Sequence, residues 1–213
     1  MDKSPILLVG AGGHARACID VIEQEGRFAV VGLVGLHHEV STRILGYPIL
    51  GTDTDLTSLL GDCPHAIVSV GQIKTPEPRI RLFELLERVG YKIPAIVSPR
   101  AYVSIHAAVG AGTIVMHDAL VNAGAIVGRN CIINSQALVE HDAAIADHCH
   151  ISTSAAVNSA VHIGVGTFIG SNSSVRQSIN IGARCVIGMG QRVVADCEAE
   201  TQVPPQKRVP LER

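Results

Sequence analysis

Aliphatic residues recur at every sixth position in the second half of the chain. From Val97 to Val193, seventeen successive positions at this spacing are all valine or isoleucine. The fourth residue after each of them is nearly always small, as at Ala101, Ala119 and Cys131. Neither the 3.6-residue period of an α-helix nor the two-residue period of an ordinary strand produces this spacing. The pattern predicts a β-solenoid built from hexapeptide repeats.

Three hexads make one coil of 18 residues, and the coils predict columns of stacked side chains. One column, from Val103 through Val121 to Val193, is valine at every coil. Neighbouring coils should lie about 4.8 Å apart, as strands do in any sheet. Glycine follows the aliphatic residue at several repeats, and we interpret these glycines as tight corners that need a relaxed backbone. They are Gly110, Gly128, Gly164, Gly170, Gly182 and Gly188.

The first ninety residues follow a different pattern. Short apolar runs that are typical of buried strands lie at 6–9, 28–34 and 65–70. Helical patterns follow them at 17–24, 56–60 and 80–89. This alternation predicts a small Rossmann-like α/β domain with a parallel sheet. We therefore expect this domain at 1–92, the solenoid at 93–197 and a tail at 198–213 that caps the last coil.

Composition and charge indicate which kinds of binding partner this chain can have. The net charge is −2 without a basic cluster, which argues against nucleic acid and against a polybasic membrane anchor. The apolar runs are too short for a signal peptide or a membrane span, so we expect a cytoplasmic protein. Flat, weakly charged solenoid walls predict a symmetric homo-oligomer. Four of the six cysteines fall on the small inward position of the hexad, which predicts buried free thiols.

A glycine-rich loop follows the first predicted strand. Gly10-Ala11-Gly12-Gly13-His14-Ala15 fits G-x-G-x-x-A between a strand and a helix, where backbone amides bind a pyrophosphate. Dinucleotide redox chemistry also requires an acidic residue about twenty positions later. The stretch Leu33 to His37 contains no acid, and the next is Glu39. The loop therefore favours a nucleotide diphosphate over a nicotinamide cofactor.

The best candidate for catalysis is an outward-facing histidine between two carboxylates, in Glu140-His141-Asp142. A neighbouring carboxylate orients an imidazole and stabilises its protonated form, as a general base requires. We interpret His106, His117 and His162 as solvated polar corners. His141 and His150 are nine residues apart, on different faces of a three-sided coil, so with His148 they make a poor metal site and we expect no metal.

Together these motifs resemble the bacterial nucleotide-sugar N-acetyltransferases of the left-handed β-helix type, which are PglD- or NeuD-like. The resemblance covers almost the whole chain. Its carriers are the glycine-histidine loop, Ala66-Ile67-Val68-Ser69-Val70-Gly71, Ile132-Ile133-Asn134, Val139-Glu140-His141-Asp142, and His150 nine residues after His141.

The resemblance implies a left-handed parallel β-helix, a homotrimer, and acetyl-CoA bound in grooves between adjacent β-helices. It implies His141 as the base, Asp142 as its acidic partner, and a Ser159 N–H that polarises the thioester carbonyl. The implied substrate-binding residues are Gly12, Gly13, His14, Gly35, Gly71, Arg79 and Asn134. The implied acetyl-CoA-binding residues are His150, Ser159 and Gly188.

One departure from the family affects the expected substrate. Members that use UDP-sugars commonly carry an Asp-Asp pair after the second strand, where this chain has Gly35-Leu36. We therefore expect N-acetylation of a 4-amino-4,6-dideoxy sugar nucleotide for surface glycan synthesis, with GDP-perosamine favoured over a UDP-linked sugar. The alternatives are a sialic-acid-type sugar O-acetyltransferase, a metal-dependent β-helix hydratase and a non-catalytic scaffold.

Overall fold

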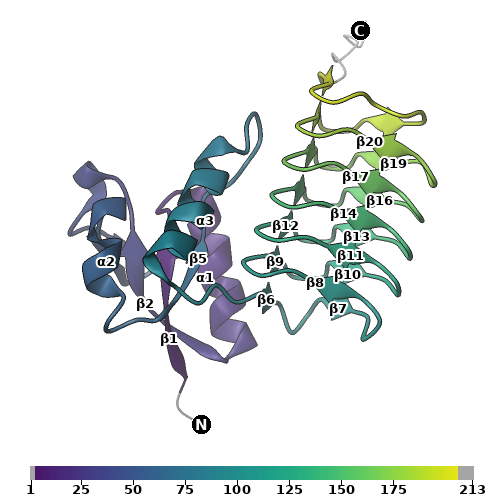
Figure 1. Ribbon diagram of the computed structural model, residues 1–213. Coiled ribbons are helices and arrows are strands. Elements are labelled where there is room, and N and C mark those ends of the chain that lie inside the picture. Colours follow the sequence, from purple (N-terminus) through teal and green to yellow (C-terminus); the bar gives the residue numbers. More distant parts are fainter. Residues whose placement is uncertain (1–2, 206–213) are drawn as a thin grey trace, which may run out of the picture.

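The N-terminal part of the chain is a five-stranded sheet with helices on both faces (Figure 1). The computed structural model describes residues 3–205. The sheet order is β3-β4-β2-β1-β5. Its strands are β1 (Ser4–Val9), β2 (Phe28–Val34), β3 (Arg43–Ile44), β4 (Tyr47–Gly51) and β5 (His65–Val68). The helical segments are α1 (Gly13–Glu25), η1 (His37–Glu39), η2 (Asp53–Asp55), α2 (Leu56–Leu59) and α3 (Glu77–Val89).

The alternation of side chains along β1 explains the layers. Ile6 and Leu8 pack with α1 on one face of the sheet. Leu7 and Val9 pack with α2 and α3 on the other. A strand that is buried on both faces needs a continuous apolar run, which is the pattern seen in the sequence. α3 ends where Gly90 adopts a left-handed conformation with φ 99°.

The prediction of an all-parallel sheet is wrong at one edge. β3 pairs with β4 in antiparallel fashion across a two-residue turn at Leu45 and Gly46. Both turn residues have positive φ, 48° and 86°, the conformation of a tight hairpin turn. β4 itself runs parallel to β2. The sheet is therefore mixed.

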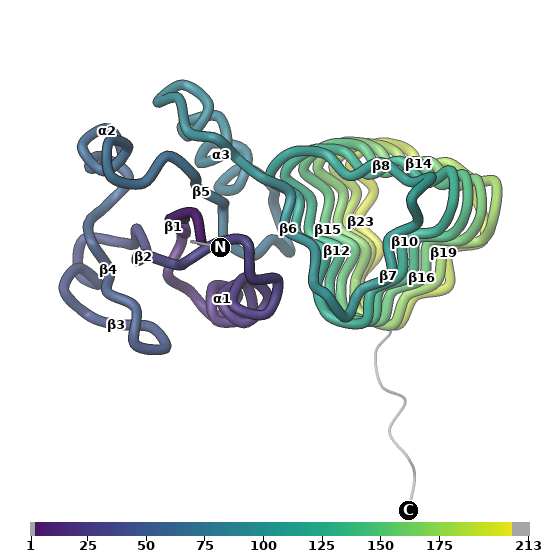
Figure 2. Tube along the Cα trace, turned by 90° about the horizontal axis from the view of Figure 1, so that it is seen from below, coloured from purple at the N-terminus to yellow at the C-terminus, as the bar shows by residue number. Residues whose placement is uncertain are grey.

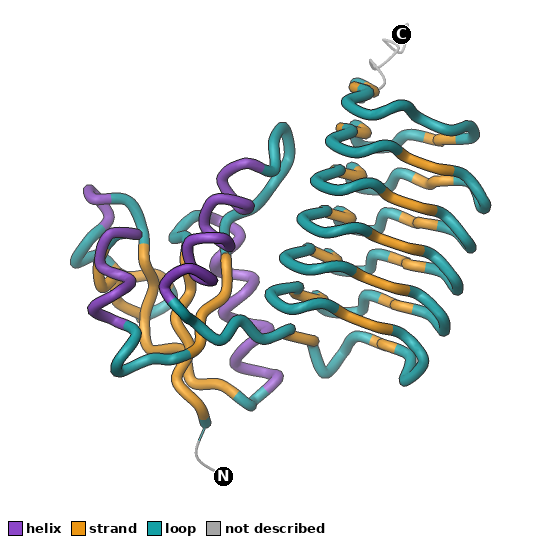
Figure 3. The backbone as a smooth tube through the Cα atoms, viewed as in Figure 1, coloured by secondary structure: helices purple, strands orange, loops and turns teal. Residues whose placement is uncertain are grey.

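The second part is a left-handed parallel β-helix of three walls (Figures 2 and 3). The seven-stranded wall contains β6 (Ile96–Val97), β9 (Ile114–Val115), β12 (Ile132–Ile133), β15 (His150–Ile151), β18 (Phe168–Ile169), β21 (Val186–Ile187) and β23 (Gln202–Val203). The six-stranded wall contains β7 (Tyr102–Val103), β10 (Leu120–Val121), β13 (Leu138–Val139), β16 (Ala156–Val157), β19 (Ser174–Val175) and β22 (Arg192–Val193). The five-stranded wall contains β8 (Ala108–Val109), β11 (Ile126–Val127), β14 (Ala144–Ile145), β17 (His162–Ile163) and β20 (Asn180–Ile181).

The predicted 18-residue coil is confirmed by the strand register. Val121 pairs with both Val103 and Val139, one coil below and one above. The valine column thus lines the interior of the six-stranded wall. Cys131, Cys149 and Cys185 are free thiols with no exposed surface, as expected, whereas Cys197 near the upper end is partly exposed. The interior is a single aliphatic core that runs along the axis.

The glycines that follow the aliphatic residues serve a purpose other than the one the sequence suggested. Positive φ values occur two residues later, as at Asn130, Asn172 and Arg184, with φ between 52° and 56°. At Gly110, a Cβ atom would lie 2.6 Å from the backbone of Gly128 in the next coil. The glycine therefore allows close approach of two backbones.

The chain beyond Cys197 continues the fold rather than only covering its end. β23 pairs with β21 and becomes the last strand of the seven-stranded wall. Residues 206–213 of the expected tail lie outside the described residues. Within 3–205, no helix combines the length and apolarity needed to cross a membrane.

The two parts meet along the lower half of the seven-stranded wall. Ile96, Ile114 and Ile132 point outward from this wall and join the same apolar cluster as Ile19 of α1. Beside this cluster lies Arg79 of α3, which has no exposed surface. Its guanidinium donates to the carbonyls of Val68 and Val70 and to the Asn130 side chain. An apolar contact and a buried polar contact thus hold the parts together.

We expect Gly110→Ala to destabilise the protein, because its Cβ would meet the Gly128 backbone at 2.6 Å. The cost should be about 1–3 kcal/mol, as for other overpacked sites. Thermal unfolding measures it. Gly61→Ala is the matched control, because a Cβ there meets nothing within 4 Å. Equal melting temperatures for the two variants would contradict this account.

Candidate active site

The glycine loop borders a cavity at the carboxyl ends of β1 and β2. α1 begins at Gly13, and no side chain caps its first turn, so the backbone N–H groups there are available to an anion. The cavity has a volume of about 330 Å³. We call it the glycine-loop cavity. Its lining includes Gly10, Ala11, Gly12, Gly35, Leu36, Glu39, Asp53 and Arg81.

Charged groups are placed at the mouth of this cavity. Glu39 accepts a hydrogen bond from the Leu36 N–H at 2.7 Å, which holds its carboxylate beside Gly35. Asp53 forms an ion pair of 2.8 Å with Arg81. The cavity therefore combines apolar walls with hydrogen-bond acceptors and one guanidinium.

His14 lies just beyond the loop, against Gly71. A Cβ built on Gly71 would be 3.6 Å from the His14 Cβ. Burial, together with the nearby Arg79 and His150, lowers the pKa of His14 to about 3, so the imidazole is neutral at physiological pH. Its Nε2 and the Oε1 of Gln72 are buried without a hydrogen-bond partner among residues 3–205. Both atoms are available to a polar ligand.

A second and larger cavity lies between the two parts, above the apolar contact. Its volume is about 880 Å³ and we call it the interdomain pocket. His150, Phe168, Val186 and Gln202 line it, each the outward residue of one strand of the seven-stranded wall. The rest of the lining comes from the loop after β5 and from the coil corners. These residues are Ile73, Lys74, Asn134, Ser152, Ser171, Gly188, Met189, Val203, Pro204 and Pro205.

Three hydrogen bonds fix the orientation of His150 and Asn134. Asn134 Oδ1 accepts the Ser135 N–H at 2.8 Å, so its amide nitrogen must be the atom that faces His150 Nε2, at 3.2 Å. That nitrogen is only a donor, and Nε2 is therefore the acceptor. The Nδ1–H of His150 donates to the Gln72 carbonyl at 2.6 Å. Burial lowers the pKa of His150 to about 4, which agrees with this neutral form.

His141 lies on a different corner of the β-helix, between the six-stranded and five-stranded walls. Its side chain is exposed, and Nδ1 faces the Asp142 carboxylate at 2.8 Å. The Glu140 carboxylate is turned away, because it accepts hydrogen bonds from Asn122 and from the His141 N–H. The Asn122 bond is the main reason for its lowered pKa. Ser159 occupies the same corner one coil higher, where Ala160 N–H donates to the His141 carbonyl.

The structure thus sorts the candidate residues into three groups. Gly12 and Gly35 line the glycine-loop cavity. Asn134, His150 and Gly188 line the interdomain pocket. The third group, His141, Asp142 and Ser159, lies on the corner opposite the seven-stranded wall and reaches neither cavity within one chain.

Arg79 differs from the sequence expectation of a substrate ligand. Its side chain is completely buried, and its terminal nitrogens are bonded to protein oxygens. Burial lowers its pKa to about 10, so it remains charged at neutral pH. The residue joins α3 to the β-helix.

Some lining residues left little signal in the sequence. Gln72 contributes a backbone carbonyl, which any residue type would supply. Ile73 and Lys74 follow β5 in a segment without a motif. Phe168 is the exception. It is one of only three phenylalanines, at an outward position of the hexad, where an aromatic residue indicates a covered surface.

Comparison with known proteins shows which proteins this chain is similar to. Residues 5–86 match the family described as the PglD N-terminal domain. The acetyltransferase domain of PglB from Neisseria gonorrhoeae, solved with acetyl coenzyme A, superposes with a TM-score of 0.86 at 28% identity. That match covers 94% of this chain and 96% of the other. The chain is therefore an acyltransferase with a PglD-type N-terminal domain, and over nearly its whole length it is similar to hexapeptide-repeat acetyltransferases.

Two further solved structures have the same fold. PerB from Caulobacter crescentus, in complex with CoA and GDP-perosamine, matches the PglD-like chain with a TM-score of 0.88 and 28% identity, covering 93% of each chain. WeeI from Acinetobacter baumannii has the same fold at 21% identity, with a TM-score of 0.82 over 95% of this chain and 97% of the other. No curated protein sequence matches significantly.

The PglD-like chain is an acyltransferase whose neighbours bind CoA or acetyl-CoA. Between residues 3 and 205, no group of three or more His, Cys, Asp or Glu side chains is placed to hold a metal ion.

The lowered pKa of His150 predicts a pH-dependent stability. The unfolded chain takes up this proton near pH 6.5 and the folded protein only near pH 4. Stability is therefore full above about pH 6.5 and falls as the pH drops toward 4. His150 should account for about 1–3 kcal/mol of this loss.

Chemical denaturation between pH 7 and pH 4 tests this expectation. His150→Gln should lose less stability over that range than the wild type, and His162→Gln, which changes an exposed histidine of the five-stranded wall, should follow the wild type. Parallel curves for all three proteins would show that His150 is not the titrating group.

Proposed function

We propose that this chain transfers the acetyl group of acetyl-CoA to the 4-amino group of a 4-amino-4,6-dideoxy sugar nucleotide. The observation that carries the proposal is that one loop borders both cavities. The segment Ser69–Pro76 follows β5, with Val70 in the lining of the glycine-loop cavity and Ile73 and Lys74 in the lining of the interdomain pocket. A nucleotide bound at the glycine loop would extend its sugar along this segment toward the pocket.

The interdomain pocket suits the acyl donor. It is elongated along the wall over three coils and the last strand, and its lining is largely apolar, as a pantetheine arm requires. Lys74 supplies a positive charge for a phosphate. Asn134 spends one amide hydrogen on His150, so its second N–H is free for a ligand oxygen. The neighbours solved with CoA support this assignment.

The glycine-loop cavity suits the nucleotide. The uncapped N-terminus of α1 favours a diphosphate. Gly35 and Leu36 stand where UDP-sugar enzymes of the family commonly carry two aspartates, and the acceptors at this cavity are Glu39 and Asp53. Guanine presents two adjacent N–H donors to a carboxylate, whereas uracil presents one. These features and the GDP-perosamine complex of PerB favour GDP-perosamine, with a UDP-linked amino sugar next.

The buried polar atoms beside the loop suit the sugar. Among residues 3–205, neither His14 Nε2 nor Gln72 Oε1 has a hydrogen-bond partner; His14 follows the glycine loop, and Gln72 precedes Ile73 of the interdomain pocket. The neutral His14 accepts a hydrogen bond at Nε2 when its proton is on Nδ1, and the amide oxygen of Gln72 accepts another. Both would pair with hydroxyl groups of the hexose.

His141 is the proposed base. With the Nδ1–H donating to Asp142, the lone pair on Nε2 is free to accept a proton. The neutral sugar amine attacks the thioester carbonyl, and His141 accepts a proton from the attacking nitrogen. The C–S bond then breaks, and CoA leaves as a thiolate that can take this proton from His141. The Ser159 N–H has no hydrogen-bond acceptor among the described residues, so it can donate to the oxygen that becomes negative.

This mechanism needs a second copy of the chain. His141 and the interdomain pocket lie on different sides of one β-helix, too far apart to act together. In a homotrimer, a neighbour's corner would close the pocket of the next copy. The flat, weakly charged outer walls, with Tyr102, Ile105 and Ile126 exposed, suit such packing.

The expected reaction is the release of free CoA when the protein is mixed with acetyl-CoA and GDP-perosamine. Thiol detection follows the rate, and mass spectrometry identifies the N-acetylated product. GDP should also raise the melting temperature more than UDP does, because a ligand of the native state stabilises it. Stabilisation and turnover with the UDP-linked sugar alone would overturn the choice of nucleotide.

A complementation assay tests the shared site. His141→Ala and Asn134→Ala should each reduce kcat, by about 10²-fold for His141, which is near the low end for acid–base catalysis. Co-expression of the two variants should restore activity, because about a quarter of randomly assembled sites would pair an intact corner with an intact pocket. Each variant expressed without the other provides the control. Absence of any gain in the mixture would place the complete site within one chain.

A further inference from the structure

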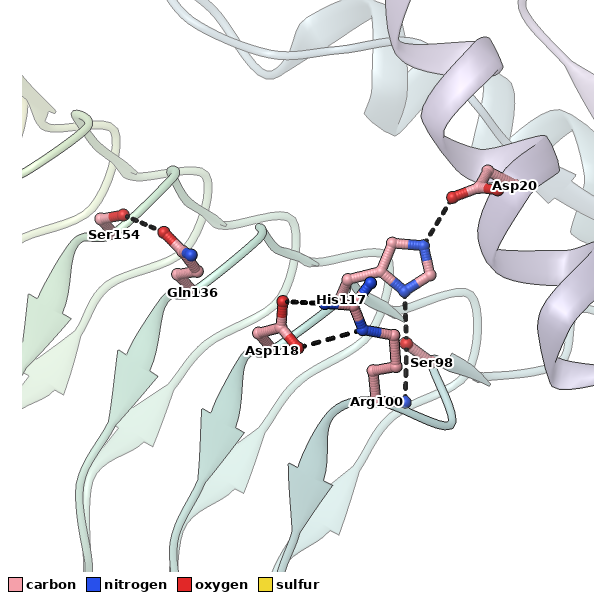
Figure 4. Close-up of polar contacts among 7 residues, drawn as sticks. All are labelled: Asp20, Ser98, Arg100, His117, Asp118, Gln136 and Ser154. Carbon is pink, nitrogen blue, oxygen red and sulfur yellow. Dashed lines mark hydrogen bonds and ion pairs between the residues drawn. The ribbon is translucent and has the colours of Figure 1, made fainter.

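A chain of hydrogen bonds ties α1 to the first coil of the β-helix (Figure 4). Asp20 of α1 is 2.7 Å from Nε2 of His117, which lies in the corner between β9 and β10. On the other side of the ring, Nδ1 is 2.6 Å from Oγ of Ser98, which follows β6. The interpretation of His117 as a solvated corner is wrong, because only 16% of its side chain is exposed.

Both ends of this chain are themselves held. The second oxygen of Asp20 accepts a hydrogen bond from Gln24 at 3.1 Å, one turn along α1. Ser98 Oγ accepts the Arg100 N–H at 3.0 Å. The side chains of Asp20 and Ser98 are therefore oriented before they meet the imidazole.

The chain persists whether or not His117 is protonated. Asp20 accepts the Nε2–H in both states. Ser98 donates its hydroxyl hydrogen to a neutral Nδ1 and accepts from a protonated one, because a hydroxyl serves both roles. The hydrogen bond from His117 lowers the pKa of Asp20.

An Asp–His–Ser arrangement is also the geometry of an activated serine nucleophile. Here that role is excluded by position. Ser98 is only 1% exposed, its Oγ already accepts a backbone N–H, and it lines neither the glycine-loop cavity nor the interdomain pocket. A substrate has no access to the oxygen.

The location of Asp20 indicates what the Asp20–His117–Ser98 hydrogen-bond chain controls, which is the orientation of α1. α1 begins directly after the glycine loop, and Ile19 packs against Ile96 and Ile114 of the seven-stranded wall. Apolar packing holds the two parts together but is non-directional. A hydrogen-bonded chain is directional, so it selects one orientation of α1 and of the loop at its N-terminus.

We propose that Asp20 and His117 are positioning residues, which set the glycine loop at the distance from the interdomain pocket that acetyl transfer requires. The proposal rests on the proposed function for its kinetic consequence. The geometric part stands on the contacts alone. The KM for acetyl-CoA should be unaffected, because the side-chain partners of Asp20 are His117 and Gln24, and neither lines the interdomain pocket.

Steady-state kinetics of Asp20→Ala, Asp20→Asn and Asp118→Ala provide the test. Asp20→Ala should lower kcat/KM for the nucleotide sugar about tenfold, since small displacements at a reacting centre are costly, and leave the KM for acetyl-CoA within about twofold. Asp20→Asn should restore most of the loss, because its amide oxygen still accepts the His117 N–H.

Asp118→Ala is the matched control. Asp118 is adjacent to His117 and carries an ion pair to Arg100 of 2.8 Å, but it makes no bond to α1 (Figure 4). It should keep the wild-type constants. Equal losses in Asp20→Ala and Asp118→Ala, or equal changes in both KM values, would refute the positioning role.

Hydrogen exchange without any ligand separates this proposal from the proposed function. Amides in α1 and the glycine loop should exchange faster in Asp20→Ala than in the wild type. In Asp118→Ala their exchange rates should equal those of the wild type. If no amino-sugar nucleotide is acetylated by the wild type, the proposed function fails, and the exchange result still decides whether the tie holds the loop. Unchanged exchange rates in Asp20→Ala would show that the Asp20–His117 contact does not hold the glycine loop.

Discussion

In-register stacking of 18-residue coils is the constraint on which the rest of this structure depends. Each coil places one aliphatic side chain inward on each wall, and its neighbours pair with it residue for residue. An insertion of a single residue would move an outward side chain into the interior, where the narrow core has no room for it. The backbone of each coil is therefore fixed relative to the next, and so are the outward columns.

One of those outward columns both contacts the N-terminal part and lines the interdomain pocket. Along the seven-stranded wall, Ile96, Ile114 and Ile132 face α1, and the column continues upward as His150 and Phe168. The lower coils hold the N-terminal part, and the upper ones form the floor of the interdomain pocket. Because both sets of coils belong to a single sheet, the N-terminal part and the interdomain pocket are held in a fixed relation to each other. The Asp20–His117 hydrogen bond also fixes the orientation of α1 relative to the β-helix.

The sequence reveals most of the architecture and part of the site. A six-residue period leaves no other way to bury one aliphatic residue per repeat, so the coil length follows from counting. The sequence does not predict the β3–β4 hairpin, because Arg43–Gly51 is too short to show alternation, although Gly46 marks its turn. It predicts a corner at Gly110 and not the close approach of two backbones, because such an approach leaves no local signature in the sequence.

Contacts between distant segments account for what remained hidden in the site. His150 was expected near the acetyl donor, but its partner is the Gln72 carbonyl, which carries no residue-specific signal. His117 and Asp20 are 97 positions apart, so only the folded arrangement shows that they meet. Arg79 is a substrate ligand only by the family resemblance, and its complete burial, which the sequence does not show, identifies it as a contact between α3 and the β-helix.

The order in which the lining residues occur along the chain has a consequence for biosynthesis. All of the glycine-loop cavity is supplied by residues up to Leu82, so a nascent chain acquires it early. The interdomain pocket draws on Gln202, Val203, Pro204 and Pro205, and it remains unfinished while the upper coils are being laid down. A ribosome-bound chain therefore contains every residue of the glycine-loop cavity before it contains those of the interdomain pocket, and translation separates the completion of the two cavities in time.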